Sequence, residues 1–191
     1  PENIIKMPWL QPYFADEKGN TIVSVHALVI ETPEKCIIVD TCLGNDKERH
    51  IPAWNKLQTK FLEDLEIAGY KTTDIDTVLC THLHTDHVGW NTVLINDKWE
   101  PTFKNADYLF GKEEWNYTEK QIEIPAYAEF INDSIIPIIE SGLVKFVEVD
   151  EKICNEITLE PTIGHTPGHV SIKIESEGKK ASITGDFLHH P

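Results

Sequence analysis

Apolar and polar positions follow two kinds of pattern along this chain. Short continuous apolar runs bounded by turn residues predict strands, whereas apolar residues three and four apart predict amphipathic helices. The runs that predict strands are residues 21–30, 35–40, 75–80, 106–110, 144–149, 157–159, 171–174 and 180–184. The helical spacing covers residues 57–68, 112–117 and 126–139, with a kink expected at Pro137. This alternation of strands and helices predicts a layered α/β domain.

No repeat, low-complexity tract or linker divides the 191 residues. We therefore expect one domain over residues 1–191, which is long enough to bury a sizeable core. The chain begins at Pro1 without a methionine and stops at Pro191, directly after a dense polar motif. This predicts a domain that is incomplete at its C-terminal end.

The charge of the chain limits its partners. Asp and Glu number 32 against 17 Lys and Arg, which gives a formal charge of −15. Nucleic acid and anionic membrane surfaces are disfavoured because this field repels them. No apolar stretch approaches the roughly 20 residues that span a bilayer. The remaining expectation is a small-molecule substrate, with a homodimer left open.

The four cysteines are Cys36, Cys42, Cys80 and Cys154, and no two of them form a CxxC pair. Three of them lie in apolar, strand-like runs, which favours buried free thiols over disulfides. Free thiols belong to a reducing compartment, and no signal peptide is visible, so we expect a cytoplasmic protein.

Histidines gather directly after the predicted strand at residues 75–80. His82, His84 and His87 fall within six residues, with Asp86 among them. Histidines two apart on a strand share a face, and a turn after His84 would aim the other two side chains at a neighbouring point. Imidazoles and carboxylates together suit zinc, with iron, manganese, cobalt and nickel as substitutes.

Two later segments repeat this arrangement. The turn Gly164-His165-Thr166-Pro167-Gly168-His169 carries a histidine near each end, and Thr184-Gly185-Asp186 places a carboxylate after an apolar strand. Each segment alone is a weak signal. Three groups of ligand residues near strand ends predict one converged metal site.

These motifs resemble those of the metallo-β-lactamase superfamily. Residues 82–87 match its HxHxDH signature, and residues 164–169 and 185–186 match its next two motifs in order. Residues 38–41 (Ile-Val-Asp-Thr) resemble its first motif, an aspartate at the end of a strand. The resemblance covers about residues 21–191 and implies a four-layer αββα sandwich.

The resemblance also implies a site for two divalent ions, zinc first, with iron, manganese or cobalt as substitutes. His82, His84 and His165 would hold one ion, Asp86 and His87 the second, and Asp186 would bridge them. A further histidine would come from beyond Pro191, since His189 and His190 follow Asp186 too closely to be equated with it.

Four other residues have expected roles outside the ligand set. Asp40 is expected to orient a ligand histidine or the metal-binding loop. His169 is expected to form a structural hydrogen bond, and His26 to lie outside the site. For Trp90 a wall of the substrate pocket and a place in the core remain equally open.

The resemblance implies hydrolysis by a hydroxide that bridges the two ions, with Asp86 carrying a proton to the leaving group. The branch that holds lactonases and methyl parathion hydrolases is the nearest, so the bond would belong to an ester, lactone or phosphotriester. Asp186 stands where zinc β-lactamases usually have cysteine, which disfavours lactams. The alternatives are a persulfide dioxygenase with one iron and a glyoxalase II-like thioesterase.

Overall fold

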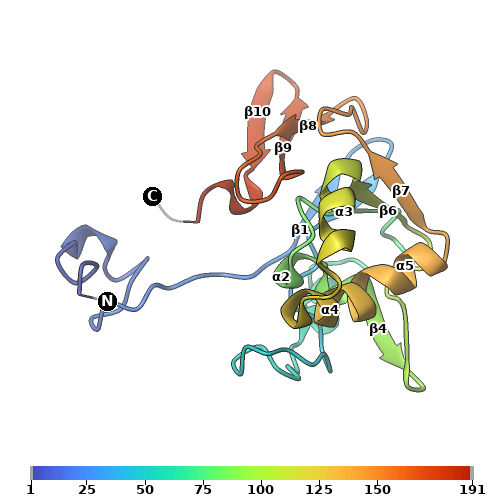
Figure 1. Cartoon of the computed structure of the whole chain (residues 1–191). Helices are drawn as coiled ribbons and strands as arrows, with labels where there is room; N and C mark the ends of the chain where they lie inside the picture. The colour runs from blue at the N-terminus through green and yellow to red at the C-terminus, as the bar shows by residue number, and fades with distance from the viewer. Residues whose placement is uncertain (1, 190–191) are drawn as a thin grey trace.

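The computed structural model describes residues 2–189 and has the expected mixed α/β architecture (Figure 1). A five-stranded sheet in the order β1-β2-β3-β6-β7 forms its centre. Its strands are β1 (Leu28–Glu31), β2 (Cys36–Val39), β3 (Thr77–Leu79), β6 (Asp107–Gly111) and β7 (Val144–Val147).

Within this sheet, strands β2, β3, β6 and β7 run parallel. Only β1 is antiparallel, because it forms a hairpin with β2. Parallel strands bring their carboxyl ends to one edge of a sheet. The motif with Asp40 follows β2 and the motif with His82 and His84 follows β3, so the topology places both at that edge.

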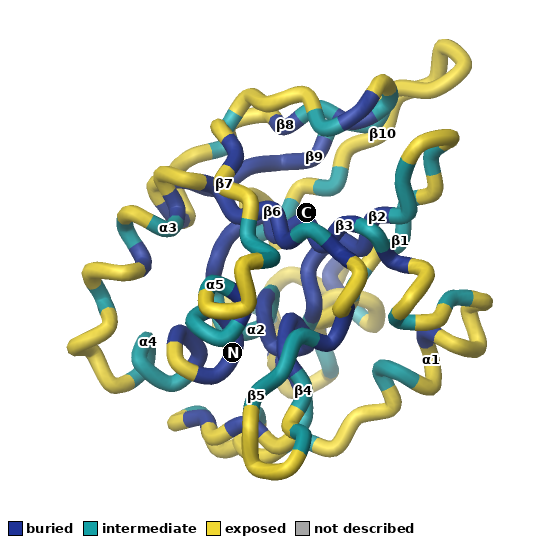
Figure 2. Tube along the Cα trace, turned by 90° about the vertical axis from the view of Figure 1, so that its right-hand side faces the viewer, coloured by how far each residue is buried: buried dark blue, intermediate teal, exposed yellow. Residues whose placement is uncertain are grey.

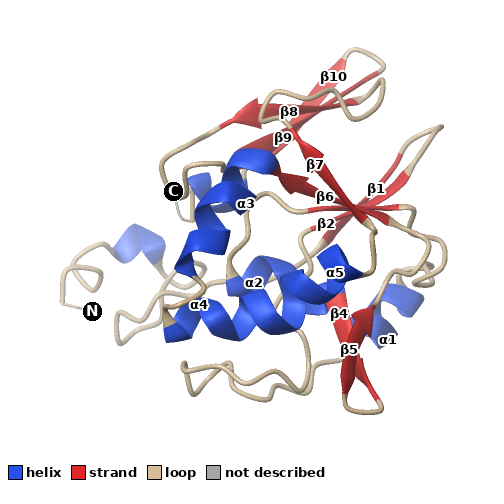
Figure 3. Ribbon diagram, turned by 45° about the vertical axis from the view of Figure 1, so that its right-hand side comes forward, coloured by secondary structure: helices blue, strands red, loops and turns tan. Residues whose placement is uncertain are grey.

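A smaller antiparallel sheet in the order β10-β9-β8 lies beside the first (Figure 3). It consists of β8 (Ile157–Pro161), β9 (Val170–Ser176) and β10 (Lys179–Ile183). The predicted hairpin around Glu177-Gly178 joins its last two strands.

The sequence pattern missed a separate hairpin of β4 (Thr92–Ile95) and β5 (Lys98–Pro101). Asn96 and Asp97 form its turn, both with positive φ, at 49° and 60°. Two such residues are typical of a type I′ hairpin turn, because Asn and Asp tolerate the left-handed region.

The helices are short. They are α1 (Phe61–Ile67), α2 (Thr85–Val88), α3 (Lys112–Thr118), α4 (Pro125–Phe130) and α5 (Ile136–Glu140). The expected helix over residues 126–139 is interrupted by a π-helical turn at Ile131–Ile135, and Pro137 lies in the first turn of α5. The interruption agrees with the expected kink, since proline cannot donate to the preceding turn.

Figure 2 shows that the central strands are largely buried. Their side chains alternate between two cores. Ile38 and Val78 face the helices, where they join a cluster that includes Phe110 and Phe130. Ile37, Val39, Leu79 and Leu109 face the other way and pack with the smaller sheet, against residues such as Ile157, Leu159 and Ile172. The central strands are thus buried on both faces, as continuous apolar runs require.

These cores define a helix layer and two sheet layers of the expected αββα sandwich. Figure 3 shows the helices on the side of the larger sheet only. In residues 2–189 no helix covers the outer face of the smaller sheet, and most of β10 is exposed.

The strand expected over residues 21–30 is much shorter in the structure. Only Leu28–Glu31 forms a ladder, because β2 is four residues long and pairs with that part alone. Apolar residues upstream of it, such as Ile22 and Val23, are exposed.

All four cysteines are free, as expected, and Cys80 and Cys154 are buried. Within residues 2–189 no helix combines the length and apolar character needed to cross a membrane.

Candidate metal centre

The segment that carries the first histidines is not the strand that the sequence predicts. β3 ends at Leu79, the chain bends at Thr81 and His82, and His84 is extended again, at φ −92° and ψ 161°. Helix α2 begins at Thr85, so the turn that redirects Asp86 and His87 is the first turn of a helix.

Three histidine rings converge beyond the end of β3. The Nδ1 atom of His84 lies 3.1 Å from Nε2 of His82 and 3.0 Å from Nε2 of His165. Ligands arranged tetrahedrally at about 2.0–2.1 Å from a zinc ion lie about 3.4 Å from one another. The three nitrogens therefore have a spacing that fits one ion, and their role as ligands stays a prediction.

A second group consists of His82, His87 and Asp186. Asp186 faces both groups with different oxygens. Its Oδ1 lies 3.2 Å from Nε2 of His87, whereas its Oδ2 lies 3.4 Å from Nε2 of His165 and 3.8 Å from Nε2 of His82. The Asp186 carboxylate thus faces nitrogen atoms of both groups.

Two histidines of the first group, His82 and His84, are poised as neutral ligands. Burial holds the pKa of His82 well below its usual range, and the like charges of His87 and His84 lower it further. Burial and the neighbouring His165 lower the pKa of His84 to about 4. Metal ligation requires neutral imidazole, so these rings need lose no proton at neutral pH.

His87 is in the opposite state. Burial disfavours its charged form, but Asp40, Asp186 and Asp86 outweigh that effect and raise the pKa of His87 to about 10. The pKa of Asp186 is held below its usual range, because the charge and hydrogen bond of His87 outweigh the opposing effect of burial. In the metal-free protein a protonated His87 therefore occupies the place beside this carboxylate.

Asp40 orients this part of the site, as the sequence predicts. Its Oδ2 accepts hydrogen bonds from Nδ1 of His87 at 2.9 Å and from the Thr81 hydroxyl at 2.9 Å, and its Oδ1 accepts one from the Thr81 amide at 2.8 Å. The Thr81 hydroxyl in turn lies 3.1 Å from Nδ1 of His82. Since that hydroxyl donates to Asp40, it accepts from His82, which leaves Nε2 of His82 free to bind an ion.

His169 has the structural role that the sequence predicts. It is fully buried, its Nε2 accepts the Asp186 amide at 3.0 Å, and its Nδ1 lies 2.9 Å from the Thr162 hydroxyl. Gly185 lets the chain pass close to it, because a Cβ there would lie 2.7 Å from Nε2 of His169 and its φ is +54°. His169 therefore fixes the backbone that presents the Asp186 carboxylate.

Asp86 lies at the border of the site. Its Oδ2 is 3.8 Å from Nε2 of His87, but it belongs to neither of the two ligand groups. His189 reaches closer than the sequence suggests, with its Nε2 3.1 Å from Oδ2 of Asp186. His190 lies outside the described residues.

An ion-pair network that no sequence pattern predicts lies next to the first residue of α2. The guanidinium of Arg49 donates twice to the Asp133 carboxylate, at 2.6 and 3.0 Å, and its Nε donates to the Thr85 hydroxyl at 2.7 Å. The ammonium of Lys47 lies 3.4 Å from the same carboxylate. One buried carboxylate is thus shared by two buried cations near the start of α2.

We expect Asp133→Ala to lower the free energy of unfolding by about 3–5 kcal/mol, because it strands two buried cations without their counter-ion. Denaturant unfolding of the metal-free protein measures this loss. Asn132→Ala, at the exposed neighbouring position, is the control and should change stability by about 0.5 kcal/mol or less. Equal losses in the two variants would contradict the role of the ion pairs.

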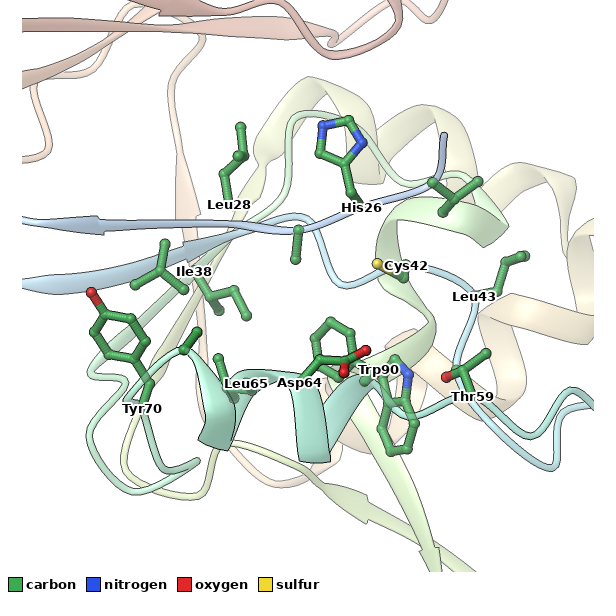
Figure 4. A pocket seen from close by; sticks show the side chains of 16 residues that line it. His26, Leu28, Ile38, Cys42, Leu43, Thr59, Asp64, Leu65, Tyr70 and Trp90 are labelled. Carbon is green, nitrogen blue, oxygen red and sulfur yellow. The ribbon is translucent and has the colours of Figure 1, made fainter. Parts of the chain in front are cut away.

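A cavity of about 480 Å³ lies between residues 25–29 and the inner face of α1 (Figure 4). Trp90 lines it and stacks on Phe61, with ring centroids 5.3 Å apart, and is 4% exposed. Neither expectation for Trp90 fits alone, since it packs in the interior and walls a cavity that none of the six predicted ligands lines. His26, also at this cavity, is exposed and lies outside the ligand groups, as expected.

Comparison with known proteins identifies the family. Residues 20–191 match the model of the metallo-beta-lactamase superfamily. The chain belongs to this superfamily. Its fold and the resemblance of its motifs are thereby confirmed.

Similar proteins in the superfamily include an N-acyl homoserine lactonase of Bacillus cereus, 26% identical over 83% of this chain and 62% of that protein. Among solved structures, the hydrolase AbOPH is 25% identical at a TM-score of 0.76, over 98% of this chain and 62% of that one. The dizinc quorum-quenching lactonase AidC is 22% identical at a TM-score of 0.70, over 95% and 60%, and shows the fold alone. The chain thus spans about three fifths of the length of these relatives.

The protonation state of His87 predicts a proton count for metal binding. At pH 6, where zinc-bound water with its pKa of about 7 is mostly un-ionised, the ion that binds His87 should release about one proton. The ion at His82, His84 and His165 should release fewer, because burial lowers the pKa of the first two rings. Calorimetric zinc titrations in two buffers of different ionisation enthalpy give both counts.

Asp40→Asn is the matched variant for this titration, since Asp40 is the largest cause that raises the pKa of His87. The released fraction of a proton should fall in this variant. Binding of zinc without proton release in the unaltered protein would show that His87 is already neutral.

Proposed function

We propose that the whole protein is a metal-dependent hydrolase that cleaves a lactone, ester or phosphotriester at a site for two divalent ions, most suitably zinc. The observation that carries this proposal is the Asp186 carboxylate, whose two oxygens face two different groups of ligand atoms. The lactonase relatives support the lactone within this range.

When bound, two such ions supply a water molecule that is ionised near neutral pH and an electrophile for the substrate oxygen. His82, His84 and His165 would hold one ion, His87 and Asp86 the other, and Asp186 would contact both. His87 must give up its proton to take this role, and Asp40 fixes the ring by accepting from its Nδ1.

Asp86 has a second task in this proposal. Its carboxylate lies beside His87 but outside the tight ligand groups, and the side chain is 22% exposed. A carboxylate that water can reach can take up a proton and pass it to the leaving alkoxide.

The test measures metal content and hydrolysis together in the whole protein. We expect about two zinc-like ions per chain, loss of activity with a chelator and its return with zinc or cobalt. N-acyl homoserine lactones, aryl esters and the phosphotriester paraoxon should react far faster than penicillin, because Asp186 replaces the cysteine of the zinc β-lactamases. They should also react far faster than single-stranded DNA, because the acidic surface repels polyanions.

Two results would overturn the proposal. Penicillin as the fastest substrate would show that the bridging aspartate does not exclude lactams. One iron per chain together with oxygen consumption on glutathione persulfide would identify a dioxygenase.

A further inference from the structure

A buried glutamate outside every metal-binding motif contacts two of the segments that carry the histidines. Glu114 lies in the first turn of α3 and is 1% exposed. Its Oε1 accepts a hydrogen bond from the amide of Leu83 at 3.0 Å, and its Oε2 accepts one from the amide of Gly168 at 3.0 Å. Each oxygen therefore holds a different segment of backbone.

Both amides are flanked by site histidines. Leu83 lies between His82 and His84, and its side chain is buried at 1% exposure. Gly168 lies in the turn between His165 and His169. These segments come from the two different sheets, so contacts between them fix their distance, among them the hydrogen bond from the Val170 amide to the Thr81 carbonyl at 3.1 Å.

The close approach of the His165 turn to helix α3 requires a glycine at position 168. A Cβ at this position would lie 2.3 Å from the backbone nitrogen of Glu114 and 2.6 Å from its Cα. The clash would be with helix backbone, which cannot move aside. A glycine here lets the histidine turn rest directly on the N-terminal turn of α3.

Among the described residues, no cationic side chain forms an ion pair with the Glu114 carboxylate. A buried carboxylate is costly unless hydrogen bonds compensate it. The two amides supply that compensation, and charge-assisted bonds are shorter and stronger than neutral ones. Glu114 is therefore held in place by the same two segments that it holds.

We propose that Glu114 is a positioning residue of the metal centre, which clamps the His82–His84 segment to the His165 turn so that the three nitrogens are spaced for an ion before it binds. This inference rests on the proposed metal-dependent function. Glu114 touches no reacting atom and acts only through the two amides.

The test compares Glu114→Gln with Glu113→Gln, its exposed neighbour in the same helical turn. Glutamine keeps one acceptor oxygen but turns an NH₂ group towards the second amide, so one clamp bond is lost. We expect cobalt affinity at the three-histidine group to fall about 10- to 100-fold in Glu114→Gln, as for other residues that orient metal ligands. Glu113→Gln should bind cobalt like the unaltered protein.

Cobalt titrations followed by visible absorption give the affinity and also the geometry of the bound ion. The absorption band of the folded Glu114→Gln variant should differ in position or intensity from that of the unaltered protein. Circular dichroism confirms that the variant is folded. If Glu114→Gln does not fold, Glu114→Asp, which retains the charge but is one methylene shorter, should show the same changes more weakly.

The outcomes separate two failures. Unchanged cobalt affinity and absorption in a folded Glu114 variant would overturn the positioning role, even if the variant unfolds at a lower temperature. Absence of cobalt binding in the unaltered protein would overturn the proposed metal centre and the clamp with it.

Discussion

His82→Ala should abolish metal binding at the three-histidine group and lower hydrolysis by about 10³-fold or more. His82 is buried at 1% exposure, and only its Nε2 is free for an ion, because its Nδ1 donates to the Thr81 hydroxyl. Loss of a Lewis acid worth several kcal/mol removes a factor of ten for each 1.4 kcal/mol or so. Zinc per chain, measured by atomic emission after gel filtration, should fall from about two to about one or less.

His26→Ala is the control for this variant, because His26 is exposed and contributes to neither group. Its zinc content and turnover should match the unaltered protein. If His82→Ala retains both ions, the ligand set is centred elsewhere.

The sequence predicts the candidate site well because its donors are concentrated. His82, His84, Asp86 and His87 lie within six residues, and the two other predicted members, His165 and Asp186, each follow a glycine in a recognisable turn. Parallel strands bring their carboxyl ends together, so motifs that follow β2 and β3 must meet. The order of the motifs along the chain thus predicts which side chains converge.

The sequence does not predict that Glu114 and Arg49 support the site, because their partners are distant along the chain. Glu114 binds amides 31 and 54 residues away, and Arg49 binds an aspartate 84 residues away. A glutamate in a short polar helix has the pattern of a solvent-facing residue. Only the packing of α3 against both histidine segments buries it.

The fold shows the same division between local and distant causes. Continuous apolar runs predict the central strands, because both faces are buried there. The pattern over residues 21–27 is equally apolar, but β2 is too short to pair with it, so only Leu28–Glu31 forms a strand. Strand formation depends on a partner, which alternation along one segment cannot reveal.

The orientation of His87 depends on both a local and a distant cause. The motif supplies the ring, and Asp40, from a separate strand end, accepts from its Nδ1 at 2.9 Å. The pKa of about 10 results from carboxylates in three separate places along the chain, Asp40, Asp86 and Asp186. The chemistry of a single ligand is therefore a property of the assembled edge of the sheet.

Asp86→Ala should lower turnover far more than it lowers bound metal. We expect turnover to fall about 10²- to 10⁴-fold, the range for loss of a general acid, while most of the zinc remains, because His87 and Asp186 still hold the second ion. The geometry supports this asymmetry, since Asp86 lies outside the tight ligand groups and is partly exposed. Metal analysis beside steady-state kinetics on the whole protein measures both losses.

Asp86→Asn separates the two roles of this side chain more sharply, because an amide oxygen can still contact an ion but cannot carry the proton. Its metal content should be nearer that of the unaltered protein, while its turnover with a poor leaving group should be as low as that of Asp86→Ala. Substrates with an activated leaving group, such as 4-nitrophenyl esters, need little protonation and should lose much less. His165→Ala is the comparison, because loss of a pure ligand lowers metal content and turnover together for every substrate. Equal proportional losses of metal and turnover in the Asp86 variants would show that Asp86 matters only as a ligand.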